Sequence, residues 1–167
     1  MELSKKERLM LYNQFDILEK LSQDKAEEEY YSRKKEIVSY GFVSEYDTLV
    51  EGFEETSKEI CEEVKSILSM FRSLETSFSK LSDKSGIDKD DVEFKGFDEN
   101  NEFDHYFFLD WYVKDRYTEY RDKDLNTHYN TLGHYRNMLK KYNAIKSKYH
   151  NKFHLLSKDE IMTIIKC

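Results

Sequence analysis

The chain has 167 residues, a mass of 20.2 kDa, a formal net charge of −7 and no proline. Its length predicts one domain, residues 1–167, and its 13 Tyr and 11 Phe exclude a disordered chain, since such chains are poor in aromatic residues. No apolar run approaches the ~18 residues of a membrane span, and because the first residues are charged and amphipathic we expect no signal peptide. With only Cys61 and Cys167 as thiols, we expect a cytoplasmic protein with no membrane partner.

Charge is divided unevenly along the chain. Residues 136–154 contain six basic residues and no acidic one, whereas residues 45–63 contain eight acidic residues and a single lysine. The basic segment could bind nucleic acid, or it could pair with the acidic segment within the molecule or across a subunit interface. The acidic chain as a whole would repel a polyanion, which favours pairing with the acidic segment, or a solvated face, over nucleic-acid binding. The candidate basic face consists of Arg136, Lys140, Lys141, Lys146, Lys148 and Lys152, with Tyr142, Tyr149 and Phe153 between them.

Capping signals predict the first helices. Ser4 with Glu7 forms a capping box, and Asp24 with Glu27 repeats the start signal. Apolar residues follow each start at helical spacing. The first stripe is Met10, Leu11, Phe15, Leu18 and Leu21, and the second is Ala26, Tyr30, Ile37 and Val38. We expect Gly41 to end the second helix in a left-handed turn and Ser44 to open a short third helix.

The strongest helical pattern lies between residues 60 and 81. Its apolar residues alternate in steps of four and three, as in a heptad seam: Ile60, Val64, Ile67, Phe71, Leu74, Phe78 and Leu81. A two-stranded coiled coil is one interpretation. The flanking Cys61, Leu68 and Met70 widen the stripe, however, which favours a helix packed by several neighbours in a bundle.

Residues 82–101 interrupt the helices. Ser85-Gly86 indicates a turn, and Val92-Glu93-Phe94 alternates like a short extended segment. A helix from Glu102 to Tyr120 follows, apolar nearly all round, so we expect it to lie centrally with one flank in a subunit interface. Further helices are predicted from Thr127 to Lys148 and from a capping box at Ser157 with Glu160. The predicted fold is therefore all-α, a bundle of about six helices, with any subdomain boundary falling within residues 82–101.

Several stretches resemble the YfbU-like family of small bacterial proteins. They are MELSKKERLMLYNQFDILEKL, VEFKGFDENNE, RYTEY, YRNMLKKYN and FHLLSKDEI, which together span nearly the whole chain in the same order. The family-motif residues carried over include Gly96, Phe97, Asp98, Arg116 and Tyr117. The others are Leu9, Asn13, Gln14, Thr118, Tyr135, Met138, Leu139, His154, Leu155 and Ser157. The resemblance implies an all-helical, soluble, self-associating protein, and it carries no chemistry with it.

Candidate chemistry is sparse. Asp110 and Lys114 form an i,i+4 pair on the aromatic helix. The preferred interpretation is a structural ion pair or a polar stripe that faces water, and the alternative is a buried pair in which the pKa of Asp110 is shifted. Arg116 could hold a carboxylate between helices. One interpretation of this cluster is a hydrolase or metal-dependent enzyme whose pocket contains Asp110 and Arg116. His150 and His154 share the i,i+4 spacing of metal ligands but lack a third ligand nearby. Cys61 beside the apolar seam reads as a buried structural thiol. We therefore predict no catalytic residue, no metal site and no cofactor.

The preferred function is that of a non-catalytic cytosolic interaction protein that acts as a homo-oligomer. Its basis is the excess of aromatic residues and the opposed charged segments. The alternative is a nucleic-acid-binding module that uses the basic segment 136–154.

Overall fold

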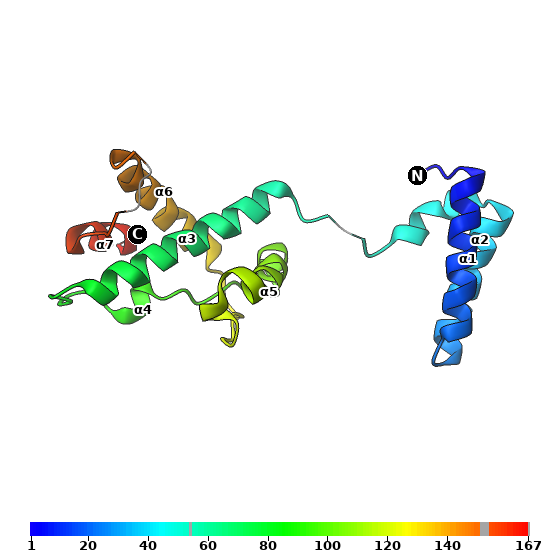
Figure 1. Cartoon of the computed structure of the whole chain (residues 1–167), viewed down its shortest axis with the longest axis horizontal. Coiled ribbons are helices and arrows are strands. Elements are labelled where there is room, and N and C mark those ends of the chain that lie inside the picture. The colour runs from blue at the N-terminus through cyan, green and yellow to red at the C-terminus, as the bar shows by residue number, and fades with distance from the viewer. Residues whose placement is uncertain (54, 151–153, 167) are drawn as a thin grey trace. The chain divides into compact units, whose positions relative to one another are not determined.

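The structure is a computed structural model that describes residues 1–53, 55–150 and 154–166. It confirms the predicted all-α class. The chain divides into two compact units, Met1–Glu55 and Thr56–Cys167, each with a hydrophobic core of its own (Figure 1). The division thus falls between Glu55 and Thr56 and not within residues 82–101. That segment stays inside the second unit because Ile87, Phe94 and Phe97 are buried in its core. Within the described ranges, no helix is long and apolar enough to cross a membrane.

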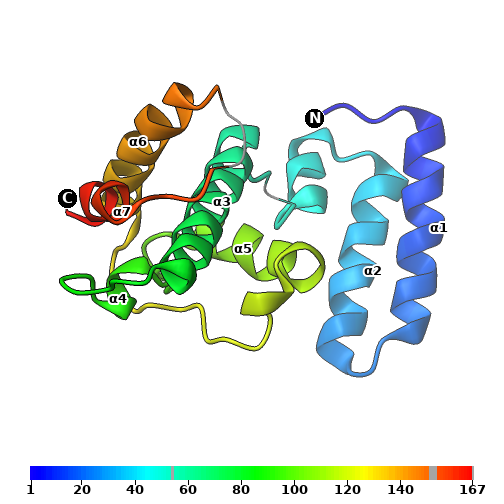
Figure 2. The same ribbon diagram turned by 60° about the vertical axis from the view of Figure 1, so that its left-hand side comes forward.

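The first unit is a helical hairpin followed by a 3-10 helix. Helices α1 (Lys5–Leu21) and α2 (Lys25–Tyr40) lie side by side (Figures 1 and 2), and η1 follows at Val43–Val50. The predicted caps are confirmed: Ser4 and Glu7 form the capping box, Asp24 caps α2, and Gly41 ends it at φ +74°. Arg8 donates to the carbonyl oxygens of residues 38 and 39 at 2.7 Å each, which ties α1 to the end of α2.

The core of the first unit is smaller than the apolar stripes predict. It consists of Phe15, Ile37, Val38, Tyr46 and Leu49. Met10, Leu18 and Leu21, which the sequence places on the inner stripe of α1, are exposed. A helix in a hairpin buries only the side that faces its single neighbour, so the remaining apolar positions of α1 turn outward.

The second unit is built around α3 (Lys58–Lys80). Helices α4 (Lys89–Val92), α5 (Phe103–Arg116), α6 (Leu132–Lys148) and α7 (Lys158–Ile165) all contact it, and η2 (Thr118–Tyr120) follows α5. The views in Figures 1 and 2 both place α3 in the middle of these helices. Its buried stripe includes Leu68 and Met70 beside the heptad positions, which confirms the bundle in place of a two-stranded coil.

Three boundaries in the second unit differ from the sequence prediction. The extended contact is a single parallel bridge between Phe97 and Asn126, because α4 already includes Val92. Helix α6 begins at Leu132 instead of Thr127, since His128 adopts a left-handed φ of 55° that no helix tolerates. The predicted helix from Glu102 to Tyr120 ends at Arg116 and continues as η2. The capping box of Ser157 with Glu160 is confirmed at α7.

Helix α5 is not buried on several sides as expected. It buries only His105, Leu109 and Val113, while Phe103, Phe107 and Trp111 are exposed. The reason is that α5 packs mainly on α3 and on the η2 segment that follows it, so it buries only the residues on that side.

Candidate functional site

The Gly96-Phe97-Asp98 turn has a closely packed backbone that connects two distant segments of the second unit. Gly96 has φ +107°, and a Cβ there would lie 1.9 Å from the carbonyl oxygen of Leu125, so only glycine fits. Phe97 donates its N–H to that same oxygen at 3.0 Å. Asp98 accepts hydrogen bonds from the side chain of Asn101 at 2.5 Å and the N–H of Asn100 at 3.0 Å, and these contacts lower the pKa of Asp98.

Glu102 connects this turn to helix α6. Its buried carboxylate accepts from the N–H groups of Asp98 at 2.9 Å, Thr131 at 2.9 Å and Leu132 at 2.6 Å, and from the Thr131 hydroxyl at 3.1 Å. Since Leu132 is the first residue of α6, Glu102 caps that helix from outside it. Sequence reasoning missed this role, because nothing in the spacing of residues 102 and 131 indicates that they meet.

A second polar cluster joins three helices of the second unit. Glu63 on α3 accepts two hydrogen bonds from Arg136 on α6, at 2.7 and 2.8 Å, and lies 2.8 Å from Nε2 of His105 on α5. The Arg136 guanidinium lowers the pKa of Glu63 to about 2, with a further contribution from His105. Arg136 belongs to the predicted basic face and Glu63 to the acidic segment, so these two segments do pair within the molecule at this point.

The rest of the predicted basic face lies on and after α6. Lys140 and Lys141 line a surface hollow of about 540 Å³ with Lys166, whose carbonyl oxygen accepts from the Lys141 ammonium. The ammonium of Lys146 is 5.7 Å from the ring centroid of Tyr142, and Lys148 is exposed. Lys152 and Phe153 lie outside the described residues.

The aromatic residues of this segment are engaged in the fold. Tyr142 is buried, and its hydroxyl is 2.9 Å from that of Ser73. Tyr149 stacks on His154 with ring centroids 3.7 Å apart and donates to Glu160 at 3.0 Å. His150 and His154 do not share a helix, because α6 ends at Lys148.

The polar cluster predicted on α5 faces solvent. Asp110 and Lys114 form an ion pair at 2.7 Å, with 56% and 59% of their side chains exposed. The preferred interpretation of an ion pair that faces water is therefore confirmed, and the alternative of a buried pair is wrong. Arg116 ends α5 and its side chain is exposed, although its carbonyl oxygen accepts from Arg72 at 3.3 Å.

Arg72 takes the position between helices that the sequence assigned to Arg116. It pairs with Glu119 at 2.6 Å, and its guanidinium carbon lies 3.7 Å from the ring centroid of Tyr117. Burial raises the pKa of Tyr117, so its hydroxyl stays protonated. Tyr117 stacks in turn on the buried Tyr120. The RYTEY stretch therefore packs the end of α5 onto α3. Cys61, expected to be buried, is partly accessible on α3.

A row of exposed rings lies on α5, and we call it the α5 aromatic stripe. It consists of Phe103, Phe107 and Trp111, whose side chains repeat at i, i+4 and i+8 and are 57%, 62% and 65% exposed. The first two rings stack with centroids 5.6 Å apart. By helical geometry, Asp110 and Lys114 lie on the same side of the helix as the stripe.

Comparison with known protein families matches the YfbU domain over residues 1–167. The match covers both units and confirms the resemblance that the sequence motifs indicate. In the structure, the carried-over Gly96, Phe97 and Asp98 form the turn before α5, where Phe97 hydrogen-bonds to the segment that precedes α6. Tyr117 packs the end of α5 onto α3.

Proposed function

The chain belongs to the YfbU domain family, and we propose that it acts as a non-catalytic helical interaction protein that works as a homo-oligomer. The α5 aromatic stripe supports this proposal. Large aromatic side chains carry much of the binding energy of protein interfaces, and isolated monomers rarely expose several of them in one row.

A second copy of the chain is the partner that suits this surface. A two-fold interface uses the same patch on both subunits, so the patch must complement itself. The stripe meets this requirement because it carries both an acid and a base, Asp110 and Lys114, beside its rings. When two α5 helices pack antiparallel, the acid of one copy can approach the base of the other while the rings are buried between them.

Removal of one ring from the stripe should weaken self-association enough to measure. Burial of a phenylalanine side chain contributes about 1.5–3 kcal/mol, and a two-fold interface contains each residue twice. Phe107→Ser should therefore weaken self-association by about 3 kcal/mol or more, which corresponds to roughly a hundredfold increase in the dissociation constant.

Light scattering tests the proposal. At micromolar concentration and moderate salt, the wild-type chain should have a mass that is a multiple of 20.2 kDa. Phe107→Ser should be monomeric, whereas Phe53→Ser, a matched change at another exposed ring, should keep the wild-type mass. Trp111 is the only tryptophan, so its emission should shift to longer wavelength when the wild type is diluted into monomers. A monomeric wild type, or a Phe107→Ser variant with the wild-type mass, would contradict the proposal.

Nucleic-acid binding is the second candidate function. The hollow beside Lys140, Lys141 and Lys166 is the observation that favours it, because its lining contains three lysines and no acidic residue. A labelled single-stranded oligonucleotide should then bind at low salt, with an affinity that falls steeply as salt rises. The Lys140→Glu/Lys141→Glu variant should lose this binding and Lys6→Glu, at an exposed lysine of the first unit, should retain it. Absence of binding by the wild type at low salt would remove this candidate.

A further inference from the structure

A separate cavity of about 330 Å³ lies between the segment around α4 and the start of α6. Its floor is apolar and deeply buried, formed by Phe71, Tyr135 and Met138. Its rim is polar and open, and includes Asp91, Tyr129 and His134. Cavities that bind small molecules usually start at about this volume and combine an apolar floor with a few polar groups in this way.

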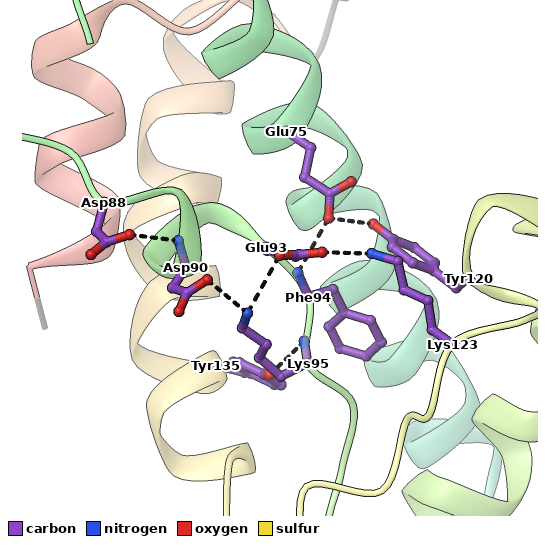
Figure 3. A network of polar contacts seen from close by, with 9 residues as sticks. All are labelled: Glu75, Asp88, Asp90, Glu93, Phe94, Lys95, Tyr120, Lys123 and Tyr135. Carbon is purple, nitrogen blue, oxygen red and sulfur yellow. Dashed lines mark hydrogen bonds and ion pairs between the residues drawn. The ribbon is translucent and has the colours of Figure 1, made fainter.

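The walls of the cavity are held in place by hydrogen bonds (Figure 3). The ammonium of Lys95 bridges Asp90 at 3.2 Å and Glu93 at 3.4 Å, and the N–H of Lys95 donates to the Tyr135 hydroxyl at 3.4 Å. On the adjoining residue, the N–H of Phe94 donates to Glu75 at 3.2 Å. A ligand would therefore meet a site that is already formed, and binding would require little ordering of the protein.

The charges around the cavity favour a cation. Its lining contains three carboxylates, Asp90, Asp91 and Glu93, and one ammonium group, that of Lys95. The Lys95 ammonium forms ion pairs with Asp90 and Glu93, and Glu93 is also paired with Lys123 at 2.7 Å. Within the described residues, the carboxylate of the exposed Asp91 has neither a hydrogen-bond nor an ion-pair partner, so it is the carboxylate available to a ligand.

The rings of the cavity suit the same class of ligand. Tyr129 is 60% exposed at the rim, where its ring face can attract a positive charge, and the buried Tyr135 is part of the floor. Burial raises the pKa of Tyr135, so its hydroxyl stays neutral. An anionic ligand would instead be repelled by the carboxylates of the rim.

We propose that this cavity binds a small organic cation, an ammonium or guanidinium group on a short carbon stem. The charged group binds Asp91 and the ring of Tyr129, and the stem packs on Phe71 and Met138. The site lies away from the α5 aromatic stripe in sequence and shares no residue with it, so it does not depend on self-association.

Calorimetric titration with n-butylamine and n-pentylamine tests the site. Both amines should bind with saturation, whereas 1-butanol, which lacks the charge, and butyrate, which reverses it, should not. The Asp91→Asn variant should weaken amine binding by about tenfold or more, as expected when a charged hydrogen-bond partner is removed. Asp122→Asn, at another exposed aspartate, should bind like the wild type.

The position of the bound amine can be followed by NMR. The methyl signal of Met138 on the cavity floor should shift on addition of n-butylamine and should shift less in Tyr129→Ala. Three outcomes would overturn the proposal: no saturable binding of either amine at millimolar concentration, equal binding by Asp91→Asn and the wild type, or a bound amine that leaves Met138 unchanged. The last outcome would indicate general attraction to an acidic protein.

Discussion

Replacement of Glu102 by glutamine should destabilise the second unit strongly while it preserves side-chain size. The carboxylate accepts four hydrogen bonds, two on each oxygen, from the turn at Asp98 and from the start of α6 at Thr131 and Leu132. Glutamine keeps one oxygen and puts an NH₂ group where the other stood. If the oxygen stays toward Thr131 and Leu132, the N–H of Asp98 faces another donor and is left buried without an acceptor.

The magnitude follows from these contacts. An unsatisfied buried N–H costs about 1–3 kcal/mol, and each remaining bond loses the added strength that a charged acceptor provides, about 1 kcal/mol. Removal of a buried charge recovers part of this loss, because the carboxylate no longer has to be kept out of water. We expect a net decrease of about 2–3 kcal/mol in the free energy of unfolding.

Urea unfolding followed by circular dichroism measures this change, and amide hydrogen exchange at Leu132 localises it to the start of α6. Glu99→Gln is the matched control, since Glu99 lies in the same turn but is exposed, and its carboxylate accepts from the Asn126 side chain at 2.8 Å and from no other described residue. It should change stability by less than about 0.5 kcal/mol. If Glu102→Gln unfolded like this control and Leu132 kept its protection, the role assigned to Glu102 would be refuted.

Two further predictions concern the same unit. Gly96→Ala should lower the free energy of unfolding, measured in urea, by about 3 kcal/mol or more, because the added methyl group would collide with the Leu125 carbonyl. Gly86 also has a positive φ but lies in open space, so Gly86→Ala should lower it by only about 1–2 kcal/mol. Because the pKa of Glu63 is about 2 in the folded protein and near 4.5 in the unfolded chain, its carboxylate stabilises the fold above pH 4.5, and this stability is lost as the pH falls toward 2. In Glu63→Gln, the free energy of unfolding should therefore depend less on pH between those values. If Gly96→Ala and Gly86→Ala lowered the free energy of unfolding equally, the first prediction would be contradicted. If Glu63→Gln unfolded in acid like the wild type, the second would be contradicted.

Local signals in the sequence predicted the helices well. The caps at Ser4, Asp24 and Ser157 and the terminator Gly41 all act as expected, because each signal involves residues within one turn of one another. The wide stripe of α3 was also recognised, since a helix with neighbours on several sides needs apolar residues around much of its circumference.

Contacts between distant segments could not be predicted in the same way. The position of Glu102 under Thr131, and that of Arg72 on the Tyr117 ring, depend on how α3, α5 and α6 pack, which no local spacing encodes. The exposure of the α5 aromatic stripe was missed for a related reason. Composition shows that a helix is rich in rings, but only the number of neighbouring helices determines how many of those rings are buried.

The positions of the exposed rings and the available cations separate the two candidate functions. Proteins that hold single-stranded nucleic acid combine stacking rings and cations along one groove. Here the exposed rings of α5 lie beside a neutral ion pair, whereas Lys140 and Lys141 lie on α6, where Tyr142 is buried in the core. Arg136 is moreover already held by Glu63. Phe107→Ser should therefore abolish self-association without a change in oligonucleotide binding, and the double lysine variant should do the reverse. If one variant removed both properties, the two surfaces would have to be parts of a single site.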